Sequence, residues 1–267
     1  MSARPAHDGA PMRPVAFLVT FLGAWTVLDR LVPSPLRAGG SAVALLAAGT
    51  VLVVGEIAFG RHRSPKALVA RLGLGRPDPR AIVAALVVAG AVVATTVGGA
   101  RLLGIDLELR PRWPEVLIGV VLFHGIAEEL VWRGFAFGHL RRSAAFWRAI
   151  ARSIPLIALT HVPIIFGNGV AIGSLAVLSA ATTCLPLAYL WERGGHTIWG
   201  PAIVHGSVGT WQLFLRSFPA SFSVLILLSS IVVPLSAFLF GDRFFRGTVD
   251  PDATDHVPTV ALDAGVR

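Results

Sequence analysis

Two adjacent carboxylates and a guanidinium lie in a stretch that is otherwise as apolar as a membrane-spanning helix. They are Glu128, Glu129 and Arg133, inside an apolar run over residues 113–137. One charged residue at the bilayer centre costs about 2.5 to 3.5 kcal/mol on insertion scales, so three persist only if they pair and face a protein interior. Glu129 precedes Arg133 by four residues, on the same helix face. We therefore expect Glu129 to neutralise Arg133, which leaves Glu128 as the surplus acid.

Three of the eight histidines, His124, His161 and His205, also fall inside apolar runs. A lone buried histidine is usually a packed hydrogen-bonding residue, whereas three beside two glutamates favour a site. At 1.5 Å per helical residue, Glu128 lies roughly 15 Å from the inner end of its helix, His161 about 12 Å and His205 about 10 Å. These depths predict that the three residues meet in one cavity in the inner half of the bilayer.

The chemistry of such a site would be hydrolytic. A carboxylate in a poorly hydrated cavity suits a general base, one imidazole can hold or activate water, and another can donate to a developing oxyanion. Glu128, His161 and His205 could instead ligate zinc and leave an open position for water. His124 lies four residues before Glu128 on the same face, and it either orients that carboxylate or simply packs.

The composition is that of an integral membrane protein. Hydrophobic residues make up 54% of the chain, charged residues only 14%, and the mean hydropathy is +0.71, whereas soluble domains average about 25% charged residues. The net charge is +8, but the basic residues lie in loops between apolar runs, which orients a membrane protein and does not predict a nucleic-acid partner. The single cysteine, Cys184, cannot form an intramolecular disulfide and is expected to be a buried packing residue.

Eight apolar runs predict an all-α, polytopic bundle of about eight transmembrane helices. The runs cover residues 15–32, 41–59, 81–103, 113–140, 154–166, 170–191, 198–215 and 221–240. The first resembles a signal peptide but is interpreted as an uncleaved helix. The fifth is short for the ~20 residues that a bilayer needs, so it is tilted or extended by its neighbours.

The loops and tails predict the topology. Eight spans put both termini on one side, and most Lys and Arg residues outside the spans fall on that side, so we expect both termini in the cytoplasm of a bacterial cell. We divide the chain into N-terminal transmembrane helices (1–112), a catalytic core (113–216), a last transmembrane helix (217–246) and an acidic, disordered tail (247–267). Segments 64–74 and 146–152 are either short amphipathic helices at the inner interface or positively charged connectors.

Two motifs in this core resemble those of the CAAX protease and bacteriocin-processing family, which includes the type II CAAX prenyl endopeptidases. The EExxxR motif runs from Glu128 to Arg133 and is followed by the expected Gly134. The FxxxH motif ends at His161, with Ile157 where the aromatic residue usually stands. The resemblance covers about residues 113–215, and the first hundred residues match only in being hydrophobic.

The third motif, HxxxN or HxxxH, departs from the family pattern. It begins at His205, but its fifth position is Gly209, so the oxyanion donor expected one turn later is missing. Gln212 lies seven residues after His205, roughly on the same helix face, and is the candidate substitute. The departure is also compatible with a family member whose peptidase activity is reduced or lost.

The resemblance implies an intramembrane endopeptidase whose core opens toward the cytosol and whose substrate is a membrane-associated protein or peptide, prenylated or not. By the same resemblance Glu128 activates water with His161, His205 helps to bind the oxyanion, and Glu129 and Arg133 support the site structurally. The resemblance is compatible with a metal-free enzyme and with one in which Glu128, His161 and His205 hold a zinc ion.

Two other functions fit parts of the sequence. A non-catalytic scaffold or immunity-type membrane protein would explain Gly209. A proton-coupled transporter would also bury Glu and His, and Glu56 near the inner end of the second run would be its additional residue. Snorkelling of Glu56 to the interface is the simpler interpretation.

Overall fold

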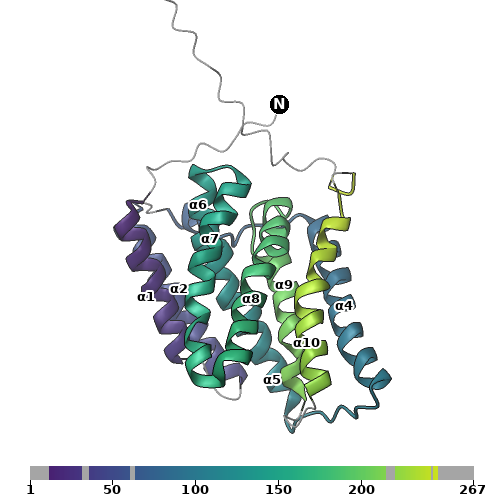
Figure 1. Ribbon diagram of the computed structural model, residues 1–267. Helices are drawn as coiled ribbons and strands as arrows, with labels where there is room; N and C mark the ends of the chain where they lie inside the picture. The colour runs from purple at the N-terminus through teal and green to yellow at the C-terminus, as the bar shows by residue number, and fades with distance from the viewer. Residues whose placement is uncertain (1–11, 32–35, 61–63, 215–219, 242, 246–267) are drawn as a thin grey trace, which may run out of the picture.

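A computed structural model describes residues 12–31, 36–60, 64–214, 220–241 and 243–245 of this chain (Figure 1). Helices account for nearly all of these residues. No β-strand occurs within the described ranges, which hold only an isolated bridge between Leu109 and Phe214. The expected all-α membrane class is therefore confirmed. The tail over residues 247–267 lies outside the described residues, and the division into domains stays a prediction.

The helices follow the apolar runs closely. In chain order they are α1 (Pro14–Leu31), α2 (Ala38–Ala58), α3 (Pro65–Arg71), α4 (Pro79–Leu102), α5 (Trp113–Val120), η1 (Val121–Ala127), η2 (Leu130–Phe137), α6 (Gly138–Ser143), α7 (Phe146–His161), α8 (Pro163–Arg193), α9 (Trp199–Val208), η3 (Gly209–Leu213), α10 (Ala220–Val232) and η4 (Pro234–Leu239). The segment 64–74 thus contains a short helix, α3, whereas 146–152 is simply the beginning of α7.

Six helical segments among the described residues are long and apolar enough to cross a membrane. They are Pro14–Leu31, Ala38–Ala58, Pro79–Leu102, Phe146–Gly167, Gly169–Arg193 and Phe222–Leu239. The fifth apolar run is short in the sequence, and its helical segment extends back to Phe146. Of the two expected alternatives, tilt or extension by neighbouring residues, the structure shows the extension. The count of eight spans is not confirmed. The runs that carry the paired acids and His205 are divided into short α-, π- and 3₁₀-helical segments.

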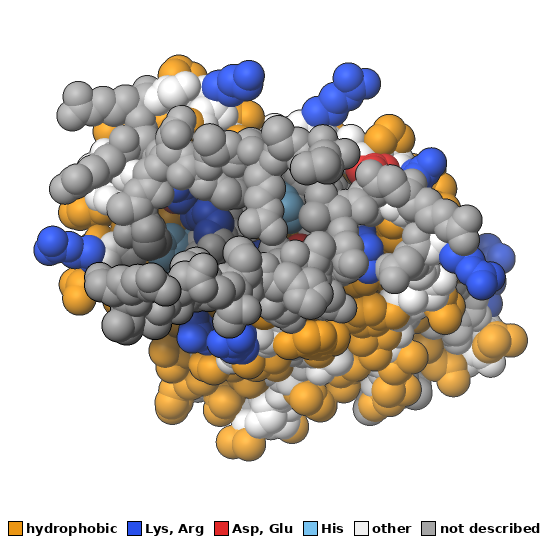
Figure 2. Space-filling view, turned by 90° about the horizontal axis from the view of Figure 1, so that it is seen from above, with side chains coloured by type: hydrophobic (Ala, Val, Ile, Leu, Met, Phe, Trp, Pro, Cys, Tyr) orange, Lys and Arg blue, Asp and Glu red, His pale blue; other side chains and the backbone are white. Residues whose placement is uncertain are grey.

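The spanning helices stand side by side and form antiparallel neighbours (Figure 1). The α1 helix packs on α2, and α7 packs on α8. The short helix α9 lies against α4, α8 and η1, so it is surrounded by longer helices. Viewed from above this bundle, Lys and Arg side chains gather on the end face and hydrophobic side chains cover the flank (Figure 2). This distribution agrees with the positive-inside argument, although the orientation of the termini stays a prediction.

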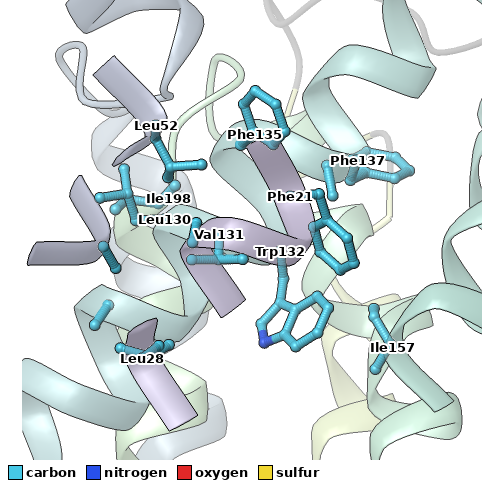
Figure 3. Packing of buried hydrophobic residues seen from close by; sticks show 14 of the residues in the cluster. Phe21, Leu28, Leu52, Leu130, Val131, Trp132, Phe135, Phe137, Ile157 and Ile198 are labelled. Atoms are coloured by element: carbon cyan, nitrogen blue, oxygen red, sulfur yellow. The ribbon is translucent and has the colours of Figure 1, made fainter. Parts of the chain in front are cut away.

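The largest hydrophobic cluster surrounds the helix that carries the paired acids. Every residue of η2, from Leu130 to Phe137, is buried. Trp132 packs against Phe21 of α1 with ring centroids 5.3 Å apart, and Phe137 meets Trp191 of α8 at the same distance (Figure 3). A helix that is buried on all sides lies at the centre of a bundle. The acids are therefore enclosed by protein.

Glu56 is buried and does not snorkel to the interface as the sequence suggested. Its residue is only 1% exposed, and its Oε1 lies 3.9 Å from Nη2 of Arg142 on α6. The interpretation as a snorkelling residue is wrong because α6 brings a cation to the end of α2. The ion pair is long, and neither oxygen of Glu56 nor Nη2 of Arg142 has a hydrogen-bond partner among the described residues.

Close packing of η2 against the loop after α3 depends on Gly134. A Cβ at this position would collide with the carbonyl oxygen of Leu72 and lie 3.3 Å from Cγ2 of Ile198. We expect Gly134→Ala to lower the free energy of unfolding by about 1–3 kcal/mol, the usual cost of overpacking. Thermal unfolding in detergent would measure this change. Gly90→Ala is the matched control, because a Cβ at the exposed Gly90 meets nothing within 4 Å; equal melting of the two variants would contradict the packing argument.

Candidate active site

The paired acids lie where one long helical stretch changes its winding. Helix α5 leads into the π-helical segments η1 and η2, and Glu128 and Glu129 lie between these two segments with helical backbone angles. Wide π turns are rare and occur mostly at functional sites, because they change which side chains share a face. This local winding sets the directions of the two neighbouring carboxylates.

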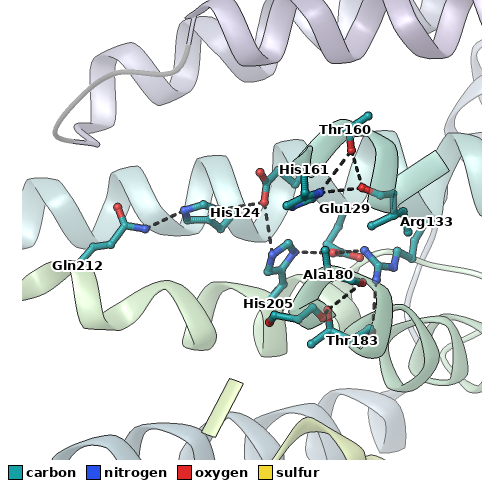
Figure 4. Close-up of polar contacts among 12 residues, drawn as sticks. His124, Glu129, Arg133, Thr160, His161, Ala180, Thr183, His205 and Gln212 are labelled. Atoms are coloured by element: carbon teal, nitrogen blue, oxygen red, sulfur yellow. Dashed lines mark hydrogen bonds and ion pairs between the residues drawn. The ribbon is translucent and has the colours of Figure 1, made fainter. Parts of the chain in front are cut away.

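Glu129 is the structural acid of the pair. It is fully buried, and its Oε1 accepts hydrogen bonds from Nη1 of Arg133 at 2.9 Å and from Nδ1 of His205 at 2.6 Å (Figure 4). Nη2 of Arg133 also donates to the carbonyl oxygen of Thr183 on α8 at 3.4 Å. The expected ion pair between Glu129 and Arg133 is thus present. It joins η2 to both α8 and α9.

Glu128 faces a different environment, between two imidazoles. Its Oε2 lies 2.9 Å from Nδ1 of His124 and 3.3 Å from Nε2 of His205. About a quarter of each histidine side chain is exposed, compared with 9% of the Glu128 side chain. Among the described residues, no hydrogen bond engages Oε1 of Glu128. One oxygen of this carboxylate is therefore held, and the other is available.

His161 is held with one nitrogen available. Its Nδ1–H donates to the carbonyl oxygen of Ile157 at 2.8 Å, which leaves Nε2 as an acceptor. It lies on α7, which packs against η2, the segment that follows Glu128 and Glu129. Glu128 and His161 lie at similar levels on either side of the turn between α6 and α7, since Glu128 precedes Ser143 by fifteen residues and His161 follows Phe146 by fifteen. The structure thus brings Glu128 and His205 into contact and places His161 on the neighbouring helix.

The role expected for Gln212 needs correction. It lies in the 3₁₀ turn η3, and its side-chain nitrogen donates to Nε2 of His124 at 2.8 Å (Figure 4). The sequence placed it near His205 because it assumed that the helix continues past Gly209. The helix α9 ends at Val208 instead, so the expected helical spacing does not apply.

A metal could be held here by a set of ligands that differs in one member from the expected set. His124, Glu128 and His205 each present a ligand atom, and these atoms lie within 4.8 Å of one another. Two imidazoles and one carboxylate are a common zinc set that leaves a position open for water. Glu129 accepts a hydrogen bond from the other nitrogen of His205, as the partner of a metal-bound histidine usually does. The residues therefore fit a zinc ion, with His124 in place of His161.

Two tryptophans complete the site and were not expected from the sequence. Trp25 on α1 stacks on the ring of His161 at 6.1 Å between centroids, and Trp132 lies 6.2 Å from the same ring. Their indoles restrict the motion of His161 on the side away from its hydrogen bond. Trp132 lies between Glu129 and Arg133 in the first motif, so the sequence could have indicated it. No motif or spacing in the sequence distinguishes Trp25.

Comparison with known proteins agrees with the motifs. Residues 111–211 match the family described as type II CAAX prenyl endopeptidase Rce1-like. This match supports the family resemblance over the part of the chain that carries the three motif positions. No curated protein matches the chain.

The buried ion pair provides a test of the structural role of Glu129. We expect Arg133→Met to lower the free energy of unfolding by about 3–5 kcal/mol, because it leaves a buried carboxylate without its cation. The double variant with Glu129→Gln should lose less than the sum of the two single variants. Chemical unfolding in detergent micelles measures this coupling. Arg112→Met is the control, since the Arg112–Glu115 pair is exposed and worth little. Additive single and double effects at Glu129 and Arg133 would rule out the coupling.

Proposed function

We propose that this protein hydrolyses a peptide bond in a membrane-associated protein or peptide, as an intramembrane endopeptidase of the CAAX-processing type. The observation that carries the proposal is the state of Glu128, whose Oε2 is held between two imidazoles while Oε1 engages no described residue. His161, on the neighbouring helix α7, has its Nδ1 engaged by Ile157 and keeps the lone pair on Nε2 available. A base with one free oxygen and an acceptor imidazole together suit the activation of water.

The first step is the attack of water on the scissile carbonyl. Nε2 of His161 accepts one hydrogen bond from the water and so aims its oxygen, while Oε1 of Glu128 takes a proton. The water oxygen bonds to the carbonyl carbon, and the carbonyl oxygen becomes an oxyanion. His205 donates to this oxyanion through Nε2–H in its doubly protonated form, because its Nδ1–H is already engaged by Glu129 and Nε2 faces the reacting groups.

The second step breaks the carbon–nitrogen bond. The proton that Glu128 took from water passes to the leaving nitrogen, the carbonyl forms again, and Glu128 returns to its ionised state. Atoms and charge therefore balance with water as the only co-reactant. Arg133 takes no part in these transfers; it donates to Glu129, and Glu129 in turn keeps the ring of His205 in position.

Zinc is the alternative cofactor at this site. When bound by His124, Glu128 and His205, it would supply a more acidic water. The metal and the hydrogen bond from His124 to Glu128 exclude each other, because both use Nδ1 of His124. Elemental analysis of the purified protein separates the two chemistries. One zinc per chain, lost in His124→Ala, would favour the metalloenzyme; cleavage that depends on Glu128 in metal-free protein would favour the glutamate mechanism.

The second candidate is a non-catalytic scaffold or immunity-type protein, and only Gly209 favours it. A buried acid beside histidines would then be a relic of the family fold. The transporter is not proposed, since Glu56, its additional residue, is buried beside Arg142 and is not among the acids and histidines that contact one another in the site.

Replacement of Glu128 tests the proposed activity without a known substrate. We expect Glu128→Gln to abolish a set of peptide ends that cells with the wild-type protein produce, because the amide keeps the shape of the side chain but cannot accept a proton. Mass spectrometry of terminal peptides from isolated membranes detects these ends. Their sequences would also identify the substrate and show whether it is prenylated.

Glu108→Gln is the matched control, because it makes the same chemical change at an exposed loop position. Its peptide ends should equal those of the wild type. The endopeptidase is excluded if membranes with wild-type protein and with Glu128→Gln give identical peptide ends while both proteins are equally abundant and equally stable to heat. The non-catalytic scaffold would then be the better interpretation.

A further inference from the structure

Gly209 is required by the space around it and not by its backbone. Its φ and ψ are −73° and −8°, which any residue adopts. A Cβ at this position would lie 3.0 Å from Cδ2 and 3.5 Å from Cγ of His124, and 2.9 Å from Cγ1 of Val120. The imidazole of His124 therefore fills the space into which a side chain at position 209 would extend.

The ring that fills this space is oriented through both of its nitrogens. The side-chain nitrogen of Gln212 donates to Nε2, so the proton of the neutral ring lies on Nδ1. That N–H points at Oε2 of Glu128, 2.9 Å away. Gln212 thus determines which nitrogen of His124 carries hydrogen, and His124 delivers this donor to the reacting carboxylate.

The ring of His124 also lies beside that of His205. Their centroids are 5.8 Å apart, and both rings direct a nitrogen at the same oxygen of Glu128. The third motif pairs a histidine with a second polar side chain one turn later on the same helix. In this chain the partner of His205 comes from η1, on the opposite side of the site.

We propose that His124, with its tautomer set by Gln212, occupies the space of the side chain that Gly209 lacks, and that it acts as a positioning residue for Glu128. The inference rests on the proposed endopeptidase activity. It means that Gly209 does not mark a lost active site. The glycine and the histidine are complementary: the absent side chain makes room for a donor from another helix.

The complementarity predicts a compensating pair of substitutions. Gly209→Asn alone should lower the melting temperature, because the new amide and the imidazole compete for one space. His124→Ala with Gly209→Asn should melt above Gly209→Asn alone and should regain cleavage relative to His124→Ala. Val120→Ala with Gly209→Asn is the control, since it relieves the other close contact but leaves the imidazole in place. This control should melt below the double variant that contains His124→Ala.

Kinetics distinguish a positioning role from a purely structural one. With a peptide that spans the cleavage site found in membranes, we expect His124→Ala to lower kcat by roughly 10²-fold, the scale of a misplaced reacting group, with KM unchanged. Gln212→Leu should lower kcat by less, and His124→Asn, which keeps an N–H donor, should retain part of the wild-type rate.

Three results would overturn the proposal. Full activity of His124→Ala would remove the positioning role. Equal melting of Gly209→Asn and wild type would remove the steric argument. Equal cleavage by wild type and Glu128→Gln would reject the endopeptidase and the role of His124 with it. In that last case the melting of the double variant would still show whether His124 takes the place of a side chain at position 209, so the two failures are distinguishable.

Discussion

One carboxylate oxygen holds the centre of this protein together. Oε1 of Glu129 accepts from Arg133 on its own helix and from His205 on α9, while Arg133 reaches the backbone of α8. A buried cation or anion without a partner is costly, so the Glu129–Arg133 pair and its bonds to His205 and Thr183 fix how these three helices meet. The same arrangement directs the other nitrogen of His205 toward Glu128. The structural ion pair and the reactive site are therefore parts of one network.

Two neighbouring glutamates acquire different roles because their surroundings differ. Glu129 is fully buried, and its Oε1 is paired with both Arg133 and His205. Glu128, the next residue, is held at one oxygen by histidines that keep about a quarter of their side-chain surface exposed. Pairs of titratable groups in unlike environments are a common way to divide positioning from chemistry within an enzyme. The π-helical segments on either side make this divergence possible within one helix.

Much of the fold could be predicted because a membrane restricts a chain strongly. Backbone groups in lipid must be satisfied within helices, so long apolar runs have only one interpretation, and six of them became spanning helices. Two of the runs that contribute to the site, 113–140 and 198–215, followed this rule least. The first carries charge and is buried on all sides over η2, and the helix of the second ends at Val208. Hydropathy alone does not separate a buried helix from one that faces lipid.

The sequence by itself determined the ion pair of Glu129 and Arg133, because two residues four apart on a helix must meet whatever surrounds them. It also indicated Glu128, His161 and His205 as candidate site residues, since isolated charge and imidazole among apolar residues stand out, and their catalytic roles stay predictions. Only the tertiary structure decided that Trp25 from the first helix packs on His161, that Gln212 bonds to His124, and that Gly209 makes room for the His124 ring. These contacts join residues far apart in the chain, and their existence depends on where each helix ends and how closely its neighbours approach, which no local spacing encodes.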